Sequence, residues 1–150
     1  MTSDEFAAFR KHTIVEYARA HSSVGNWSEE EAIEKSTQAI NELLPDGQDT
    51  AETLVLTALG QSGESIGYLW IGLQRRGGSP GEAWIYDIEI YERFRGKGYG
   101  RDLLLLAESE ARRHGVIKMG LNVFGNNLIA RNLYDSAGYE ITAMQMSKDL

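Results

Sequence analysis

The chain of 150 residues is 42% hydrophobic and 25% charged, which predicts one domain over residues 1–150 with a core of ordinary size. Its formal net charge of −7 argues against nucleic acid as a partner, and the absence of cysteine excludes disulfides, thiolate metal ligands and a cysteine nucleophile while fitting a cytoplasmic location. No signal peptide is expected, and no apolar run reaches the roughly 20 residues that span a bilayer, so we expect no membrane partner.

Two helices are expected in the first third of the chain. Thr2 and Glu5 have the spacing of a capping box, and apolar residues recur at helical spacing from there to about residue 20. Ser28 and Glu31 repeat the capping-box spacing, and the run 45–47, Pro-Asp-Gly, ends the second helix. The expected buried faces carry Phe6, Phe9, Ile14 and Tyr17 in the first helix and Ile33, Ile40, Leu43 and Leu44 in the second.

Strands and helices then alternate. The runs 53–58, 65–73 and 82–91 are rich in β-branched and aromatic residues and are separated by turn residues, so each predicts a strand. The later elements expected are a helix over 101–114, a strand over 117–124, a helix over 127–136 and a final strand over 139–147. This order predicts an α/β fold, a single domain with a central mixed, mostly antiparallel β-sheet flanked by about four helices.

A glycine-rich segment, Arg93-Phe94-Arg95-Gly96-Lys97-Gly98-Tyr99-Gly100-Arg101, joins a predicted strand to a predicted helix. Three alternating glycines and four cations at a helix N-terminus are typical of a phosphate-binding turn. The glycine spacing differs from the Gly-x-Gly-x-x-Gly of dinucleotide folds, and Lys97 lacks the following Ser or Thr of a Walker loop. The alternative is a glycine-rich turn with solvated arginines.

Residues 86–100, Tyr86-Asp87-Ile88-Glu89-Ile90-Tyr91-Glu92-Arg93-Phe94-Arg95-Gly96-Lys97-Gly98-Tyr99-Gly100, closely resemble the acetyl-CoA-binding segment of the GNAT superfamily of N-acetyltransferases. A second segment, residues 121–139, resembles the family at Asn127, Ala130, Leu133, Tyr134, Gly138 and Tyr139. The two segments together cover about residues 82 to 147. The resemblance implies a GNAT-like acetyltransferase domain with acetyl-CoA as cosubstrate.

The resemblance also implies residue roles. Backbone amides of Arg95, Gly96, Lys97, Gly98, Tyr99 and Gly100 would hold the CoA pyrophosphate, and Arg95 and Arg101 would add side-chain charge. The backbone of Ile88 and Ile90 would pair with the pantetheine arm, while their side chains pack in the core. Asn127 would contact the cofactor, or else cap its helix beside Asn126. Tyr134 would protonate the leaving thiolate; the alternative is a buried aromatic with a satisfied hydroxyl.

Asp87 and Glu89 are the candidates for a general base. An amine can attack a thioester directly, but a protonated alkyl amine must first lose a proton. Strand alternation places both carboxylates on one face, opposite Tyr86 and Ile88, and a carboxylate in an apolar strand is costly unless it is paired or functional. The alternative is that each binds an arginine or covers a helix end. A bulge would change which residues face the cleft.

The sequence therefore predicts an enzyme that transfers the acetyl group of acetyl-CoA to a primary amine of a small molecule or peptide. The alternative is a non-catalytic acyl-CoA-binding or sensing module on the same fold. GNAT domains usually begin with a strand, whereas this chain enters a helix almost at once, which leaves the sheet edge and a homodimer contact open. His12, His21 and His114 have no metal-like spacing with carboxylates, so we expect no metal.

Overall fold

The computed structural model describes residues 1–146 and 148. Its helices are α1 (Ser3–Ser23), α2 (Glu29–Leu43), α3 (Tyr99–Arg113) and α4 (Leu128–Ser136), and its strands are β1 (Thr53–Leu59), β2 (Ser65–Gly72), β3 (Glu82–Ile90) and β4 (Lys118–Leu121). Short 3₁₀ helices lie at Gly47–Asp49 and Glu92–Phe94. Among the described residues, none of the helices is both long and apolar enough to cross a bilayer.

The strands form one sheet in the order β1-β2-β3-β4. The first three strands are antiparallel, and β4 pairs parallel with β3. The predicted α/β fold with a mixed, mostly antiparallel sheet and four helices is therefore confirmed over the described residues. The β3–β4 ladder covers only residues 82–85 and 118–121, so the two strands separate beyond Ile85. This separation opens the sheet beside the second half of β3.

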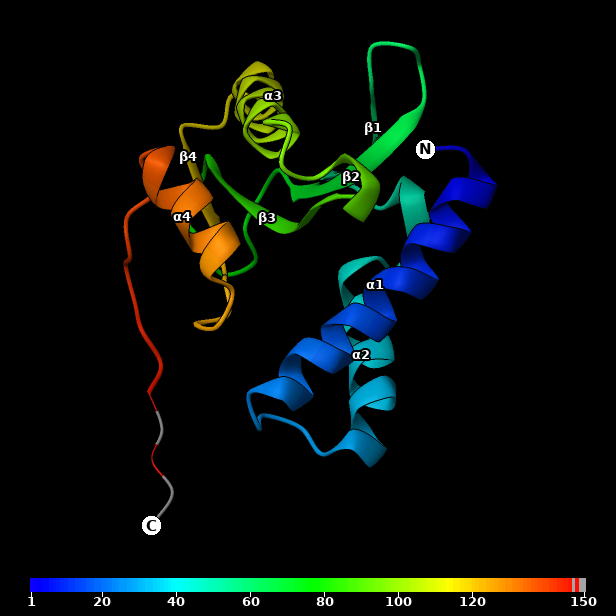
Figure 1. The fold of residues 1–150 in the computed structure, drawn as a ribbon, viewed down its shortest axis with the longest axis vertical. Helices are drawn as coiled ribbons and strands as arrows, with labels where there is room; N and C mark the ends of the chain where they lie inside the picture. The colour runs from blue at the N-terminus through cyan, green and yellow to red at the C-terminus, as the bar shows by residue number, and fades with distance from the viewer. Residues whose placement is uncertain (147, 149–150) are drawn as a thin grey trace.

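A hydrophobic core lies on each face of the sheet. Helix α3 packs on one face, where Leu104 and Ala107 are fully buried against β2 and β3. Helices α1 and α2 cover the other face, where Phe9 and Ile40 pack with Tyr68 and Trp70. Figure 1 shows these two layers, with α4 beside the open edge of the sheet. Burial of apolar side chains on both faces fixes β2 and β3 as the interior strands of the sheet.

Helices α1 and α2 begin where the sequence predicts, but only α1 has the predicted capping box. At α1 the capping box is present: Glu5 N donates to Thr2 Oγ1 at 3.2 Å and Thr2 N donates to Glu5 Oε2 at 2.7 Å. At α2 the predicted box is wrong, because the Ser28 hydroxyl donates to Glu31 Oε2 at 2.9 Å and accepts no backbone N–H. The helix still begins at the predicted position.

The predicted buried face of α2 is partly wrong, since Ile33 is 50% exposed. Helix α2 instead packs on α1 through the small residues Ala32 and Ser36. The Ser36 hydroxyl is fully buried and donates to the Ile14 carbonyl at 2.7 Å. This close approach rotates α2 away from the face that the apolar spacing predicted.

The strand predicted over 139–147 is wrong over its described part. Residues 139–146 belong to no ladder, and Ser147 lies outside the described residues. Gly138, with φ of 89°, redirects the chain after α4, and Figure 1 shows the following segment running away from the sheet. Strand-forming side chains are not sufficient without a neighbouring strand to accept and donate backbone hydrogen bonds. The strand predicted over 117–124 is likewise shorter, because β4 loses its partner at Ile85.

Candidate functional site

Residues 95–100, called here the glycine loop, connect β3 to α3 through two left-handed backbone positions. Gly96 has φ of 76°, and Gly98, which caps the N-terminus of α3, has φ of 88°. A Cβ atom added at either position would meet nothing within 4 Å. The glycines are therefore needed for backbone conformation and not for close packing.

Five successive backbone N–H groups in the glycine loop are free. From Gly96 to Gly100, none donates a hydrogen bond to any described residue, whereas the N–H groups of Arg101 and Asp102 both donate to the Gly98 carbonyl. Unpaired N–H groups and the positive end of the helix dipole together attract an anion. This geometry supports the phosphate-binding interpretation of the loop.

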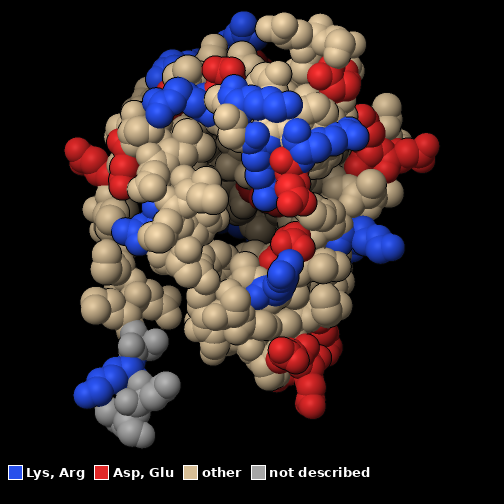
Figure 2. Space-filling model, viewed as in Figure 1, with Lys and Arg blue, Asp and Glu red and all other residues tan. Residues whose placement is uncertain are grey.

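The cations of the loop are partly engaged by the protein. Arg95 Nε donates to the Ile90 carbonyl at 2.8 Å, and Arg101 Nη2 donates to Ser136 Oγ at 2.7 Å, which ties α3 to α4. Lys97 Nζ lies 5.7 Å from the Phe94 ring centroid. Figure 2 shows Lys and Arg side chains gathered along the upper rim of a hollow. Comparison with Figure 1 places this hollow between α4, β3 and α1.

The hollow is called here the β3–α4 cleft, after the open half of β3 and the helix α4 that lie beside it (Figures 1 and 2). The Ile88 and Ile90 side chains pack into the core on the α3 face, as the packing interpretation expected. Their backbone has no strand partner on the β4 side within the described residues, because the ladder stops at Ile85. The strand is thus open to pairing with an extended ligand.

A β-bulge in β3 decides which side chains face α1. Trp70 pairs with Asp87 but the next residue, Ile71, pairs with Ile85, so Tyr86 is the extra residue. The Tyr86 ring packs on Trp70, at 4.8 Å between centroids, on the α1 face. Asp87 and Glu89 share one face, as expected, and both contact α1 there. The prediction that Tyr86 lies opposite them is wrong, because a bulge turns two successive side chains to the same side.

Asp87 is held by two hydroxyl groups and contacts no cation among the described residues. Its Oδ2 accepts hydrogen bonds from Tyr68 at 3.0 Å and from Thr13 at 3.3 Å. Burial raises the pKa of Asp87 to about 6; the Tyr68 hydrogen bond opposes this shift and the charge of Glu89 adds to it. A carboxylate whose pKa lies near neutrality is suited to take a proton from a substrate.

Glu89 lies two residues further on the same strand, and its carboxylate is more fully engaged. Its Oε1 accepts from Arg95 Nη2 at 3.1 Å, and its Oε2 lies 2.9 Å from the Tyr68 hydroxyl and 2.8 Å from His12 Nε2. Among the two candidate bases, Glu89 is therefore the ion-paired one and Asp87 the one without a cation. Sequence spacing carried no signal for His12 or Tyr68, since they come from α1 and β2.

Tyr134 lies on α4 and packs against the core on the α3 face. Burial raises the pKa of Tyr134 to about 12, and the charge of Asp87 adds to the shift. Its hydroxyl forms no hydrogen bond with any described residue, unlike the satisfied hydroxyl of the structural interpretation. Asn127 caps α4, its Oδ1 accepting from Ala130 N at 3.1 Å, which leaves its amide NH₂ group for other contacts.

An aromatic cluster joins α1 to the loop between β4 and α4. His21 stacks on Trp27 with centroids 3.9 Å apart, and Phe124 meets the His21 ring edge-on at 5.2 Å. Tyr17 contacts both His21 and Trp27. Burial lowers the pKa of His21, which keeps this ring neutral near pH 7. The cluster therefore links α1 to the loop that precedes α4.

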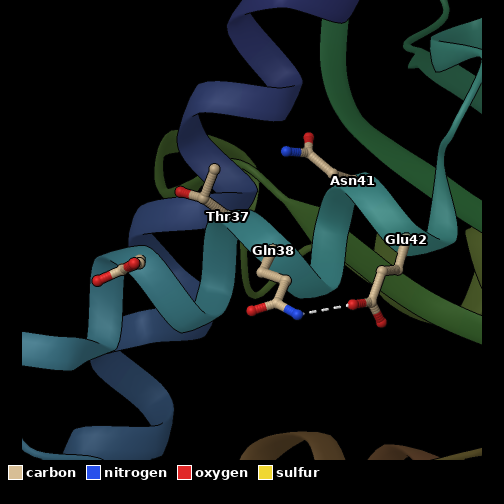
Figure 3. A pocket seen from close by; sticks show the side chains of 5 residues that line it. Thr37, Gln38, Asn41 and Glu42 are labelled. Carbon is tan, nitrogen blue, oxygen red and sulfur yellow. Dashed lines mark hydrogen bonds between the residues drawn. The ribbon is translucent and has the colours of Figure 1, made fainter.

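Two further observations concern other places where a ligand or a metal ion could bind. A separate depression lies on the outer side of α2 and contains none of the residues predicted from the sequence; Glu34, Thr37, Gln38, Asn41 and Glu42 line it (Figure 3). Over residues 1–146 and 148, no group of three or more His, Asp or Glu side chains is arranged to hold a metal ion.

Comparisons with known proteins agree with this geometry. A family model described as "Acetyltransferase (GNAT) family" matches residues 8–139. Two Bacillus subtilis (strain 168) proteins, "Uncharacterized N-acetyltransferase" YdgE and YycN, are 36% and 35% identical over the whole chain, which covers 95% and 96% of them.

Solved structures show the same fold. The crystal structure of the putative acetyltransferase YycN from B. subtilis matches 100% of this chain and 95% of its own with a TM-score of 0.94 and 35% identity. The PaiA N-acetyltransferase of Thermoplasma acidophilum, solved in complex with coenzyme A, matches 97% of this chain and 89% of its own with a TM-score of 0.68 and 17% identity. At that identity the likeness concerns the fold alone.

Proposed function

The chain belongs to the GNAT family of acetyltransferases, and from this premise we propose that it transfers the acetyl group of acetyl-CoA directly to a primary amine of a small molecule or peptide. The observation that carries the proposal is the row of five free N–H groups in the glycine loop; the partly buried carboxyl group of Asp87, with a pKa of about 6, is the second supporting feature. The free N–H groups suit a pyrophosphate, and the carboxyl group suits proton transfer.

The cosubstrate would bind along the glycine loop and the open part of β3. Backbone N–H groups of Gly96 to Gly100 would bind the pyrophosphate, and the open backbone at Ile88 and Ile90 would pair with the pantetheine arm. Arg95 and Arg101 lie at this loop and would add positive charge on leaving their present partners. The free amide NH₂ group of Asn127 is available from α4.

Asp87 is the proposed base and Tyr134 the proposed acid. A protonated amine gives one proton to Asp87, and its free electron pair forms the new C–N bond to the acetyl carbonyl carbon. The C–S bond then breaks, the CoA thiolate takes the Tyr134 proton, and the second amine proton restores the phenol. The balanced reaction converts an ammonium ion and acetyl-CoA into an amide, CoA thiol and one released proton.

A non-catalytic acyl-CoA sensor is the less favoured function. The Tyr134 hydroxyl bonds to no described residue, whereas a purely structural phenol would be bonded, and Asp87 has a pKa near neutrality. The relatives at 35–36% identity carry the name N-acetyltransferase. These observations support turnover more than binding alone.

The acceptor is tested by a product screen. Wild-type protein is incubated with acetyl-CoA and with polyamines, amino acids, aminoglycosides or peptides with free N-termini, and products are examined by mass spectrometry. The proposal predicts that at least one class gains an acetyl group on nitrogen, and that the product is absent without protein. Acetylation of oxygen or of no compound would contradict it.

We also propose a homodimer and a cytoplasmic location. Residues 139–146 form no ladder, and Ile141, Met144 and Met146 are largely exposed. The outer edge of β4 likewise has no neighbouring strand among the described residues. Pairing of this segment with β4 of a second copy would bury its apolar side chains and give the β4 edge a hydrogen-bonding neighbour.

A further inference from the structure

Three consecutive hydrogen-bonding contacts connect Asp87 to the surface of α1. The Tyr68 hydroxyl lies 3.0 Å from Asp87 Oδ2 and 2.9 Å from Glu89 Oε2. Glu89 Oε2 in turn lies 2.8 Å from His12 Nε2. The Asp87 end is partly buried in the cleft, whereas the His12 side chain is 43% exposed. The contacts therefore lead from the interior of the site to solvent.

The Tyr68 hydroxyl is the connecting group. It has one proton and two lone pairs, so it can donate to one carboxylate while accepting from the other carboxyl group when that group is protonated. With both carboxylates ionised, its proton can face either oxygen. Once Asp87 is protonated, the phenol can accept that proton and pass its own to Glu89 without ever becoming a phenolate.

We propose that Asp87, Tyr68, Glu89 and His12 form a relay that carries the proton released in each turnover from the cleft to solvent. The inference rests on the proposed function, in which Asp87 takes that proton from the amine. Asp87 must lose the proton before it can act again. The relay ends at the Glu89–His12 pair, from whose exposed imidazole the proton passes to water or buffer.

The other groups facing these carboxylates do not provide an exit. Thr13, the second hydroxyl on Asp87, is 4% exposed. Arg95, which contacts Glu89 Oε1 from the glycine loop, stays protonated and cannot accept a proton. The charge of Asp87 also acts on Tyr134 of α4, but in the proposed reaction the Tyr134 proton goes to the thiolate. Of the proton acceptors in the relay, His12 on α1 is more open to solvent than Glu89, since its side chain is 43% exposed against 21% for Glu89.

A structural ion pair between α1 and β3 is the competing explanation for His12. The substitution His12→Gln distinguishes the relay from the structural ion pair, because a glutamine amide can donate a hydrogen bond to Glu89 but cannot accept and release a proton. His114→Gln is the matched control. His114 is 42% exposed, its Nε2 lies 3.5 Å from Glu110 Oε1, and it lies at the far end of α3.

The test follows thiol release by stopped flow at low buffer concentration, with the amine found in the acceptor screen. For His12→Gln the relay predicts a first turnover at the wild-type rate, since Asp87 starts ionised, and later turnovers slowed by roughly tenfold or more. Added imidazole should restore the later turnovers of His12→Gln and leave wild type and His114→Gln unchanged.

Two results would overturn the relay. One is a His12→Gln protein whose later turnovers match wild type at low buffer; the other is a loss that affects the first turnover equally and that imidazole does not restore. Neither result affects the proposed function, which fails only if wild-type protein acetylates no amine. The two proposals can therefore fail separately.

Discussion

Asp87 and Glu89 show how neighbouring residues of one type acquire different chemistry. Both carboxylates lie on the α1 face of β3, but Glu89 is paired with His12 and Arg95 while Asp87 meets only hydroxyl groups. Desolvation without a compensating cation raises the pKa of Asp87 to about 6. Their surroundings therefore favour Asp87 as the proposed general base, a difference that the sequence alone did not reveal.

Replacing Asp87 should remove the acidic limb of the pH profile. A base acts only when ionised, so the kcat/KM of wild type should fall as the pH decreases through about 6. Asp87→Asn should lower kcat by roughly 10²- to 10⁴-fold and leave no inflection near that pH. Glu89→Gln is the control and should retain an inflection, moved to lower pH because the charge of Glu89 raises the pKa of Asp87. An unchanged profile in Asp87→Asn would assign the base elsewhere.

The same pKa shift predicts an effect on stability. The native pKa of Asp87, about 6, lies above the ordinary value of 3.8, so folding favours the protonated carboxyl. The stabilisation is complete below 3.8 and is lost as the pH rises through about 6. Asp87→Asn should therefore raise the melting temperature at pH 7.5, and most of the gain should disappear at pH 4. A pH-independent difference would contradict this assignment.

Tyr134 should affect turnover and not cosubstrate binding. Tyr134→Phe removes a hydroxyl that bonds to no described residue and keeps the ring that packs on the α3-side core. We expect kcat to fall by roughly 10²-fold with nearly unchanged CoA affinity measured by calorimetry. Equal losses in kcat and affinity would mean that the hydroxyl is structural.

At the scale of elements, sequence patterns located those parts of the candidate site that lie within one continuous stretch of chain. The glycine loop is one turn of backbone and could be located from its glycine spacing and charge, whereas Tyr134 was singled out by the family resemblance of the segment 121–139. The relay could not be located in either way, because His12 and Glu89 are 77 residues apart and meet only after α1 packs on the sheet. The bulge at Tyr86 and the rotation of α2 also depend on packing between elements.

Gly98 provides the test of the loop. Gly98→Val forces a β-branched residue into a left-handed position at the α3 N-terminus, next to the free N–H groups, and should abolish CoA binding. Gly63→Val is matched to it: Gly63 has φ of 83°, an added Cβ there also meets nothing, and it lies in the β1–β2 turn. Both variants should lose similar stability, measured by thermal unfolding.

The contrast between the two glycine variants decides the result. Gly63→Val should keep wild-type CoA affinity by calorimetry, whereas Gly98→Val should show no binding. If Gly98→Val binds CoA like wild type, the pyrophosphate does not bind at this loop.

At the scale of the whole molecule, the segment 139–146 explains why a correct strand propensity gave a wrong strand. Its alternating apolar residues suit a β-ladder, but Gly138 directs the segment away from its own sheet. A ladder requires a partner strand, and a single copy does not supply one for this segment among its described residues. A second copy is the proposed partner.

A homodimer can be tested by light scattering after size exclusion. Ile141→Pro removes a backbone donor from the segment and should convert a dimer to a monomer. Ile129→Ala is the control. Ile129 is also a largely exposed isoleucine, 87% against 62% for Ile141, but it lies on α4 outside the segment. A monomeric wild type, or an Ile141→Pro dimer of unchanged strength, would contradict strand pairing between copies.

The central claim is that this protein uses acetyl-CoA to acetylate an amine. The most direct measurement records CoA thiol release from acetyl-CoA across a panel of amines, beside calorimetry of CoA binding to the same protein. We predict CoA binding together with thiol release that depends on the amine and is lost in Gly98→Val. Tight binding with no release for any amine would contradict the claim and favour an acyl-CoA sensor.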